Sequence, residues 1–584
     1  MRVFKTNYRF FGLRKLATLP LILLALAACG PGGPAPDTIY YNANVVTVDS
    51  AFSVAQAVAI HADTFMAVGG DREILALAGA ETEEVDLDGR MVLPGLIEAH
   101  AHPERASLSE QEMPLDNPRT VRQCLDWVTK MVGLRQSGEW IIHDKLFATR
   151  LAELRPPSLA ELDSVAPDNP VFLNGSYGAS INSAAMVASG ITNATDHPGL
   201  LRDPETGRLS GKLRYTALHL LKRPQAPEYS LSQRVEALKQ MFALYNRAGF
   251  TSFTNGAIPL ADTLLYSYME QHNLLTVRAF LNVGNSIRSK SLTLEELRKD
   301  IARMGVVTGH GGPWWRIGAL KHMIDGGILT GTAWLRQPWG PKAGEIFGVV
   351  DPEYRGIPRM DVGQFTDFAR AAAEAGWKVT AHATGGASVD LMLEGYDRVN
   401  REVPIPPLRC SIIHGNFYTA PAMEKAARLG VIADMQPAWF FKDGDAMLHI
   451  LGPERIKTFH PYRSMIEAGV TVSAGSDHMV ILDAEESINP YSPWLAIYSM
   501  VTRRTERGTV IVPEEAISRE DALRCYTINN AYASFEETSK GSIEPGKLAD
   551  MIVIDRDYLS CPVDEIRDIT VARTVLGGRV VYRQ

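Results

Sequence analysis

The chain has 584 residues, of which 46% are hydrophobic and 22% are charged, and its formal net charge is -8. This length and hydrophobic content provide ample material for a large core. The mild negative charge, without a basic stripe or an aromatic-interleaved run of Lys and Arg, argues against nucleic acid as a partner. Its five cysteines lie far apart without a Cys-x-x-Cys spacing, so neither a zinc knuckle nor a disulfide framework is indicated.

Residues 1–28 are predicted to be a lipoprotein signal peptide and are excluded from the fold. Basic residues between Arg2 and Lys15 precede an apolar run from Leu19 to Ala28, which is shorter than the roughly 20 residues of a membrane span. The stretch that ends in Cys29 is similar to the lipobox of bacterial lipoproteins, which implies diacylation of this cysteine after cleavage. The alternatives are an ordinary signal peptide and an uncleaved anchor.

The segment that follows Cys29 predicts where the mature protein resides. Residues 29–37 are rich in Gly and Pro and form a flexible tether. Gly30 directly after the cysteine resembles lipoproteins that are sorted to the outer membrane. We therefore expect a protein of the bacterial cell envelope, held to the outer membrane by its lipid and facing the periplasm, without spanning the membrane.

Residues 38–93 predict the first part of a small β-domain. Short alternating strands are separated by turn signals at Asp49, Gly69 and Asp88, and no long helical pattern intervenes. Residues 541–584 have the same character, with β-branched strands at their centre and their end. Both ends of the chain therefore predict β-structure.

A short apolar strand near residue 90 carries His100 and His102 at its end. Residues two apart in an extended segment point the same way, so both imidazoles can bind one metal ion. Three later β-branched segments end in His382, His414 and Asp477. Strands that each end in one ligand are typical of a parallel barrel, whose active site lies at the C-terminal ends of its strands.

Residues 94–540 show the alternation of strands and long helices that a parallel sheet requires. A Pro- and Gly-rich stretch at about residues 139–221 interrupts this alternation. We interpret it as an insertion over the barrel mouth, where lids usually lie. The sequence thus predicts an α/β fold, a (β/α)8 barrel with one insertion.

The order of these motifs, His-x-His, two later His and Gly-Ser-Asp, resembles the amidohydrolase superfamily of metal-dependent hydrolases. The resemblance runs from about residue 38 to the C-terminus. Residues 181–185 and 198–213 are similar to an insertion of the amidohydrolase 3 branch, the YtcJ-like proteins, and residues 541–550 resemble the family's return to its small β-domain. The resemblance implies that both terminal segments pair into one β-sandwich beside the barrel.

Residues 315–321, followed by Asp325, look like the segment that carries a metal-bridging, carboxylated lysine in many members. The resemblance therefore implies a carbamate on Lys321, with a surface or ion-paired lysine as the alternative. It also implies one or two Zn²⁺ ions or another divalent metal. The implied ligands are His100, His102 and Asp477 for one ion, His382 and His414 for the second, and Lys321 as the bridge. Asp477 is the candidate general base and then acid.

We interpret the chain as a metal-dependent amidohydrolase that cleaves a C–N bond of a small-molecule amide, other than a peptide bond, by metal-activated hydroxide. Ester hydrolysis or decarboxylation on the same scaffold is one alternative, and a catalytically silent, ligand-binding envelope lipoprotein is another. The sequence gives no signal for an oligomeric state. The pair Gly385-Gly386 stands where the branch commonly has Gly-Asp, and Gly178 stands where a His often precedes the Asn-Ser-Ala element. Both departures are expected around the pocket, so they put in doubt any substrate carried over from better-known members.

Aromatic side chains near the strand ends predict an apolar substrate pocket, with packing between loops as the alternative. These side chains are Trp314, Trp334, Trp339, Trp439, Phe440 and Trp494.

Overall fold

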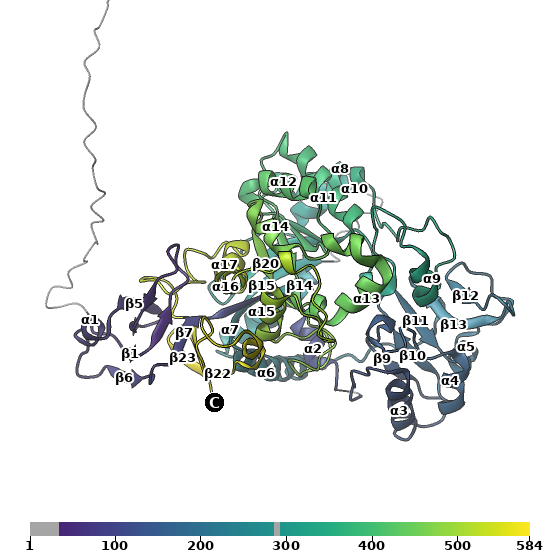
Figure 1. Cartoon of the computed structure of the whole chain (residues 1–584), viewed down its shortest axis with the longest axis horizontal. Helices are drawn as coiled ribbons and strands as arrows, with labels where there is room; N and C mark the ends of the chain where they lie inside the picture. Colours follow the sequence, from purple (N-terminus) through teal and green to yellow (C-terminus); the bar gives the residue numbers. More distant parts are fainter. Residues whose placement is uncertain (1–33, 112, 285–292) are drawn as a thin grey trace, which may run out of the picture.

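A computed structural model describes residues 34–111, 113–284 and 293–584. At its centre lies a sheet of eight parallel strands, in which neighbours in space are also neighbours in chain order (Figure 1). The strands are β8 (Leu96–Ala101), β14 (Phe250–Ile258), β15 (Arg278–Gly284), β16 (Trp315–Met323), β17 (Val379–Ala383), β18 (Ser411–His414), β19 (Ile432–Met435) and β20 (Val472–Ala474).

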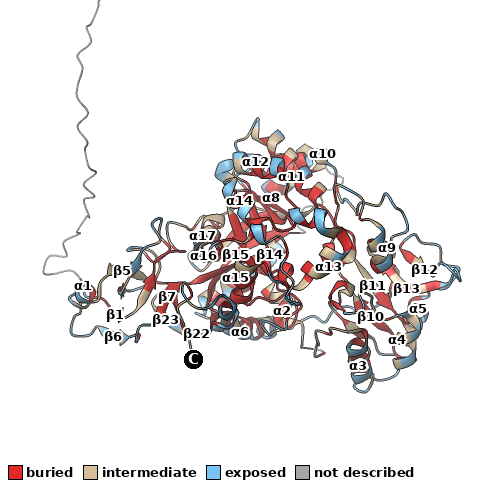
Figure 2. Ribbon diagram, in the orientation of Figure 1, coloured by how far each residue is buried: buried red, intermediate tan, exposed pale blue. Residues whose placement is uncertain are grey.

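Backbone hydrogen bonds join the first strand to the segment that follows the last one. Asp477 N donates to His100 O at 2.6 Å, and His102 N donates to His478 O at 2.7 Å. The eight strands therefore form a barrel, and their side chains are almost all buried (Figure 2). The predicted (β/α)8 barrel is confirmed.

Helices follow each strand of the barrel, and most of them cover its outside (Figure 1). They are α2 (Pro103–Leu108), α6 (Leu231–Ala248), α7 (Thr263–Gln271), α8 (Leu294–Arg303), α9 (Pro341–Phe347), α10 (Val362–Glu374), α11 (Gly386–Asn400), α12 (Ala420–Leu429), α13 (Pro437–Arg455), α14 (Tyr462–Glu467), α15 (Pro493–Thr502), α16 (Arg519–Cys525) and α17 (Ile528–Ala533). Capping residues fix the ends of several of these helices. Ser230 and Gln233 form a capping box before α6, and Gly249 ends it with a φ of +94°, where glycine carries no Cβ penalty.

The two ends of the chain share one sheet beside the barrel, on the left of Figure 1. It consists of β23 (Arg579–Arg583), β22 (Val571–Leu576), β21 (Met551–Ile554), β7 (Met91–Pro94), β2 (Asn44–Val46) and β3 (Val54–Ala55). A second sheet contains β5 (Thr64–Gly69), β4 (Ala57–His61), β1 (Thr38–Tyr41) and β6 (Glu83–Asp86), with α1 (Asp71–Leu75) against it. Both sheets contribute to one apolar cluster, which includes Val58, Val92 and Val553.

A five-stranded sheet lies at the opposite end of the molecule, on the right of Figure 1. Its strands are β12 (Leu200–Arg202), β13 (Leu209–Arg214), β11 (Gly178–Ile181), β10 (Val171–Asn174) and β9 (Ile141–His143), accompanied by α3 (Val121–Val132), α4 (Leu159–Val165) and α5 (Ser183–Ser189). Asn182 holds it together, because its Oδ1 accepts from Ala185 N and Val171 N while its Nδ2 donates to two carbonyls. The predicted limits of the insertion and of the other domains stay a prediction.

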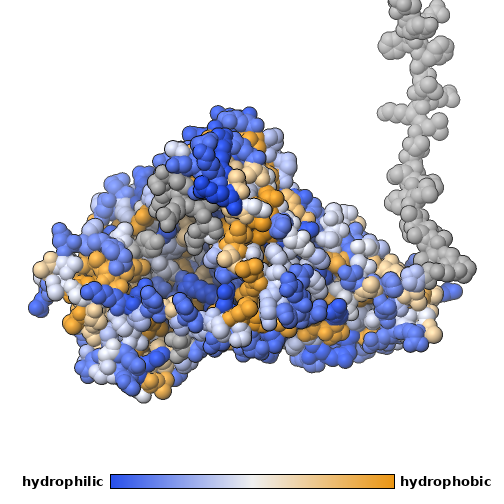
Figure 3. Space-filling model, turned by 180° about the vertical axis from the view of Figure 1, so that it is seen from behind, coloured by the Kyte–Doolittle hydropathy of each residue, from blue (hydrophilic) through white to orange (hydrophobic). Residues whose placement is uncertain are grey.

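The outer surface is mixed in character. On the reverse face, hydrophobic side chains gather in patches within a largely hydrophilic surface (Figure 3). Within the described residues, no helix combines the length and the apolar character needed to cross a membrane. The predicted signal peptide and Cys29 lie outside the described residues.

Candidate metal centre

The barrel brings all six predicted site residues to the C-terminal ends of its strands. His100 lies in β8, Lys321 in β16 and His382 in β17, whereas His414 ends β18. The other two are His102, directly after β8, and Asp477, in the loop after β20. Because the strands are parallel, segments that are far apart in sequence meet at one edge.

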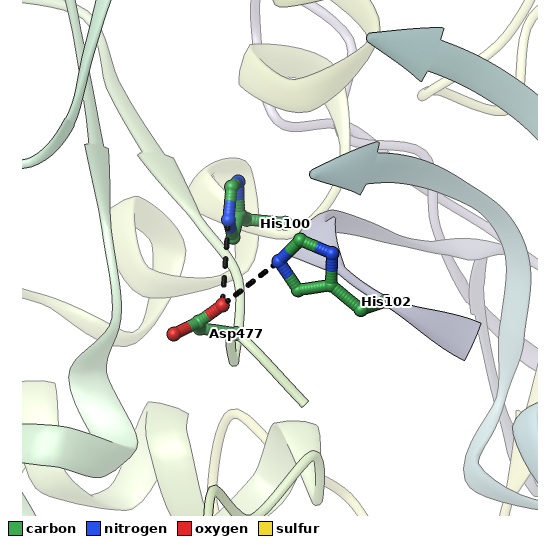
Figure 4. Close-up of side chains that lie close together, drawn as sticks. All are labelled: His100, His102 and Asp477. Carbon is green, nitrogen blue, oxygen red and sulfur yellow. Dashed lines mark ion pairs between the residues drawn. The ribbon is translucent and has the colours of Figure 1, made fainter. Parts of the chain in front are cut away.

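Three of these residues converge on one point (Figure 4). Asp477 Oδ1 lies 3.4 Å from His100 Nε2 and 3.3 Å from His102 Nε2. The ligand atoms of the three side chains lie within 4.8 Å of one another. Gly256 leaves space beside them, since a Cβ atom there would lie 2.6 Å from His102 Nε2 and 2.8 Å from His100 Nε2.

Lys321 lies beside this group, with its Nζ 3.4 Å from His100 Nε2. Burial lowers the pKa of its ammonium group to about 8, because desolvation disfavours the charged form. About a tenth of the amine is therefore neutral at pH 7, far more than for an ordinary lysine with a pKa of roughly 10.4. The neutral amine is the form that reacts with carbon dioxide to give a carbamate.

His382 and His414 lie edge to face, with ring centroids 4.5 Å apart, and the His414 centroid is 5.5 Å from that of His100. His382 Nε2 donates to Gly326 O at 3.0 Å, because a carbonyl only accepts. His414 Nδ1 donates to Gln436 Oε1 at 2.7 Å. The free ligand atoms are therefore His382 Nδ1 and His414 Nε2.

Burial sets the protonation of these groups. Desolvation lowers the pKa of His100 and of His382 to about 3, and it also lowers the pKa of His102. For Asp477, burial alone would raise the pKa, but hydrogen bonds from His100 and His102 hold it well below its usual range. Neutral imidazoles beside an ionised carboxylate are the ligand forms that a metal ion requires.

The backbone is strained at two of the predicted ligands. His414 has a φ of +74° and Asp477 a φ of +56°, values that residues with a side chain rarely adopt. Such strain persists where the surrounding structure enforces it, and it is concentrated at functional sites.

Sequence reasoning missed several supporting residues. Glu98 Oε1 accepts from His100 N at 2.9 Å and from Ser476 N at 2.8 Å, and burial raises the pKa of this carboxyl to about 8. Asn489 Nδ2 donates to Asp477 O at 2.8 Å. Glu98 could have been found from the sequence. It precedes His100 by two residues in the same strand, and residues two apart in a strand lie on the same side. Asn489 had no such signal.

A cavity of about 570 Å³ opens onto these residues. Its lining includes five of the six predicted site residues, His102, Lys321, His382, His414 and Asp477. Trp439 also lines it and stacks on His414, with centroids 4.8 Å apart.

The other five aromatic residues of the predicted pocket are not in its lining, so that part of the prediction was wrong. Trp339 and Phe440, for example, are fully buried in an apolar cluster that also contains residues of α9 and α13. Packing, the alternative for these rings, accounts for both of them.

The barrel and the convergent ligands define a class, the metal-dependent barrel hydrolases. An uncharacterized metal-dependent hydrolase from Pyrococcus horikoshii OT3 has the same fold. The two structures superpose with a TM-score of 0.66 at 21% sequence identity, over 90% of this chain and 99% of the other.

The family follows from the sequence comparison, in which the model of the Amidohydrolase family matches residues 83–582. The chain belongs to this family. The N-substituted formamide deformylase of Arthrobacter pascens is 28% identical, over 94% of this chain and 98% of the relative. YtcJ of Bacillus subtilis strain 168 is 24% identical, over 86% and 91% respectively. These findings confirm the predicted family and the predicted class, a metal-dependent hydrolase of carbon–nitrogen bonds other than peptide bonds.

Proposed function

We propose that this chain hydrolyses the carbon–nitrogen bond of a small amide, with N-substituted formamides as the first substrates to test. The observation that carries the proposal is the convergence of His100, His102 and Asp477 within 4.8 Å at the edge of the cavity. The deformylase activity for which the Arthrobacter pascens relative is named supports the choice of formamides, since the similarity covers nearly the whole chain.

The residues present fit a divalent metal ion, and Zn²⁺ prefers this set of imidazole and carboxylate ligands. Neutral imidazoles, an ionised carboxylate and the space that Gly256 leaves free meet at one point. The proposed ligands are His100, His102 and Asp477 for a first ion, His382 and His414 for a second, and a carbamate on Lys321 between them. When bound, the metal lowers the pKa of a water molecule and supplies hydroxide near neutral pH.

Asp477 is the proposed general base and acid. Its low pKa keeps it ionised at neutral pH, so its carboxylate accepts a proton from the attacking water. Asn489 Nδ2 donates to Asp477 O and lies 3.5 Å from Oδ2, which orients the carboxylate. The proton then passes to the leaving nitrogen, so that an amine and a carboxylic acid are released.

The test combines metal analysis with kinetics on N-benzylformamide and on benzyl acetate. We expect metal in the purified protein, formamide hydrolysis, and the loss of both in His100→Ala. His310→Ala is the matched control, because this exposed histidine lies before β16, at the other end of the strands. Formamide hydrolysis that survives complete chelation, or hydrolysis of the ester alone, contradicts the proposal.

We also propose that the enzyme is lipid-anchored through Cys29 in the bacterial cell envelope, on the outer membrane and facing the periplasm. The support is the basic segment, the short apolar run and the lipobox-like residues before this cysteine. A tether of residues 29–37 then places the barrel beside the membrane surface without a spanning helix.

A further inference from the structure

One wall of the cavity comes from the five-stranded sheet rather than from the barrel. Lys145 follows β9, and Ser176 lies between β10 and β11. Both line the same cavity as His102 and Asp477. Lys145 is only 7% exposed, and its Nζ donates a hydrogen bond to Ser176 Oγ. The insertion therefore presents a buried cation to the space in front of the metal centre.

Within the described part of the chain, this cation has no carboxylate partner in an ion pair, and Ser176 is its hydrogen-bond partner. The neighbouring Asp144 is already occupied, since its Oδ2 accepts from Arg105 at 2.6 Å and its Oδ1 accepts from Asn174 at 3.2 Å. The charges of Asp144 and Asp477 act on this ammonium group and raise its pKa, yet neither carboxylate forms an ion pair with it in the described structure. A buried ammonium group gains most from a charged partner in direct contact, so this arrangement favours an arriving anion.

The cavity is also lined by the carboxylates of Glu104, Asp262 and Asp477, and within the described residues none of them forms an ion pair with Lys145. Asp477 is held by His100 and His102 instead. Glu104 accepts hydrogen bonds from Tyr266 and Asn255, and Asp262 pairs with Arg234 at 3.0 Å. Burial lowers the pKa of Lys145 to about 8, which still leaves most of the amine protonated at pH 7. Arg105 is paired with Asp144 at 2.6 Å, so on this side of the cavity Lys145 is the cation that presents its charge without an ion pair, within the described residues.

We propose that Lys145 and Ser176 bind a carboxylate that the substrate carries at the end away from its scissile amide. This inference rests on the proposed function of the metal centre. The apolar side chains Phe147, Leu329 and Trp439 line the same cavity. They suit a substrate in which an apolar or aromatic group separates the scissile amide from the carboxylate. The substrate class is thus an N-acyl amine with an apolar body and a distal carboxylate.

A matched pair of formamides tests the proposal. N-(4-carboxybenzyl)formamide and N-(4-methylbenzyl)formamide differ only in the distal group. A charge-assisted hydrogen bond predicts that kcat/KM of the wild type favours the carboxylate about 10- to 100-fold. We expect Lys145→Met to lower this ratio by a similar factor. Lys130→Met, which removes an exposed charge from α3, controls for the change in net charge.

A binding measurement separates this proposal from the proposed function. Calorimetry on the metal-loaded protein compares 4-methylbenzoate with 4-methylbenzamide, for the wild type, Lys145→Met and Lys145→Gln. If neither formamide is hydrolysed, the proposed function fails, yet tighter binding of the benzoate that both variants lose still supports the carboxylate site. Equal binding of the two probes by the wild type overturns it. Benzoate binding that both variants retain also overturns it, because the metal centre then holds the anion.

Discussion

Gly256→Ala is expected to disable the metal centre without unfolding the barrel. The added Cβ would lie 2.5 Å from His102 Cε1, 2.6 Å from His102 Nε2 and 2.8 Å from His100 Nε2. Ordinary contact begins at 3.4 Å, so the His102 ring, whose Cε1 is the nearest atom at 2.5 Å, must move by about 0.9 Å. Displacements of this size exceed the roughly 0.5 Å tolerance of a preorganised site, and disturbed ligand orientation typically costs 10- to 100-fold in metal affinity.

The assay measures metal content, metal affinity and kcat/KM for Gly256→Ala beside the wild type. Overpacking lowers the free energy of unfolding by about 1–3 kcal/mol, so a folded protein is expected. Gly312→Ala is the matched control, because a Cβ atom at that position would meet Glu270 Oε1 at 3.7 Å, an ordinary contact. Full metal affinity and unchanged kcat/KM in a folded Gly256→Ala protein refute the convergence of the two imidazoles beside this glycine.

Four further changes test other parts of the molecule. Trp439→Ala removes the ring stacked on His414, so kcat/KM should fall about tenfold more for N-benzylformamide than for formamide. Equal losses for both substrates would show that the ring supports the structure and does not contact the substrate. Asp443→Ala leaves Arg150 buried without its bidentate partner, and denaturant titration should show a loss of about 3–5 kcal/mol in unfolding free energy. The Lys321→Ala variant should lose most activity and regain part of it when a short carboxylic acid is added in bicarbonate buffer. A variant that keeps full activity and full metal content would show that this lysine has a structural role only. Cys29→Ser should accumulate as an unprocessed precursor, and a wild type that takes up no fatty-acid analogue contradicts lipidation.

The metal-ligand candidates could be predicted from the sequence because their placement follows local rules. A strand turns residues two apart to one side, which pairs His100 with His102. A parallel barrel collects the C-terminal ends of its strands, which brings His382, His414 and Asp477 to the same edge. Both rules depend only on strand periodicity and on the direction of the chain, so the eight-stranded barrel and the group at its mouth were predictable together.

Contacts between the five-stranded sheet and the barrel could be seen only in the tertiary structure. The hydroxyl of Tyr177 lies 3.3 Å from His382 Nε2, although the two residues are 205 positions apart. Lys145 and Ser176 reach the same cavity from a sheet whose strands show no metal-ligand pattern. Of six aromatic residues near strand ends, only Trp439 lines the cavity, because the packing of helices and loops around the barrel sets where each ring points. The sequence by itself therefore determined the fold and the ligand candidates, whereas the side chains that shape the substrate pocket depend on how the five-stranded sheet packs against the barrel.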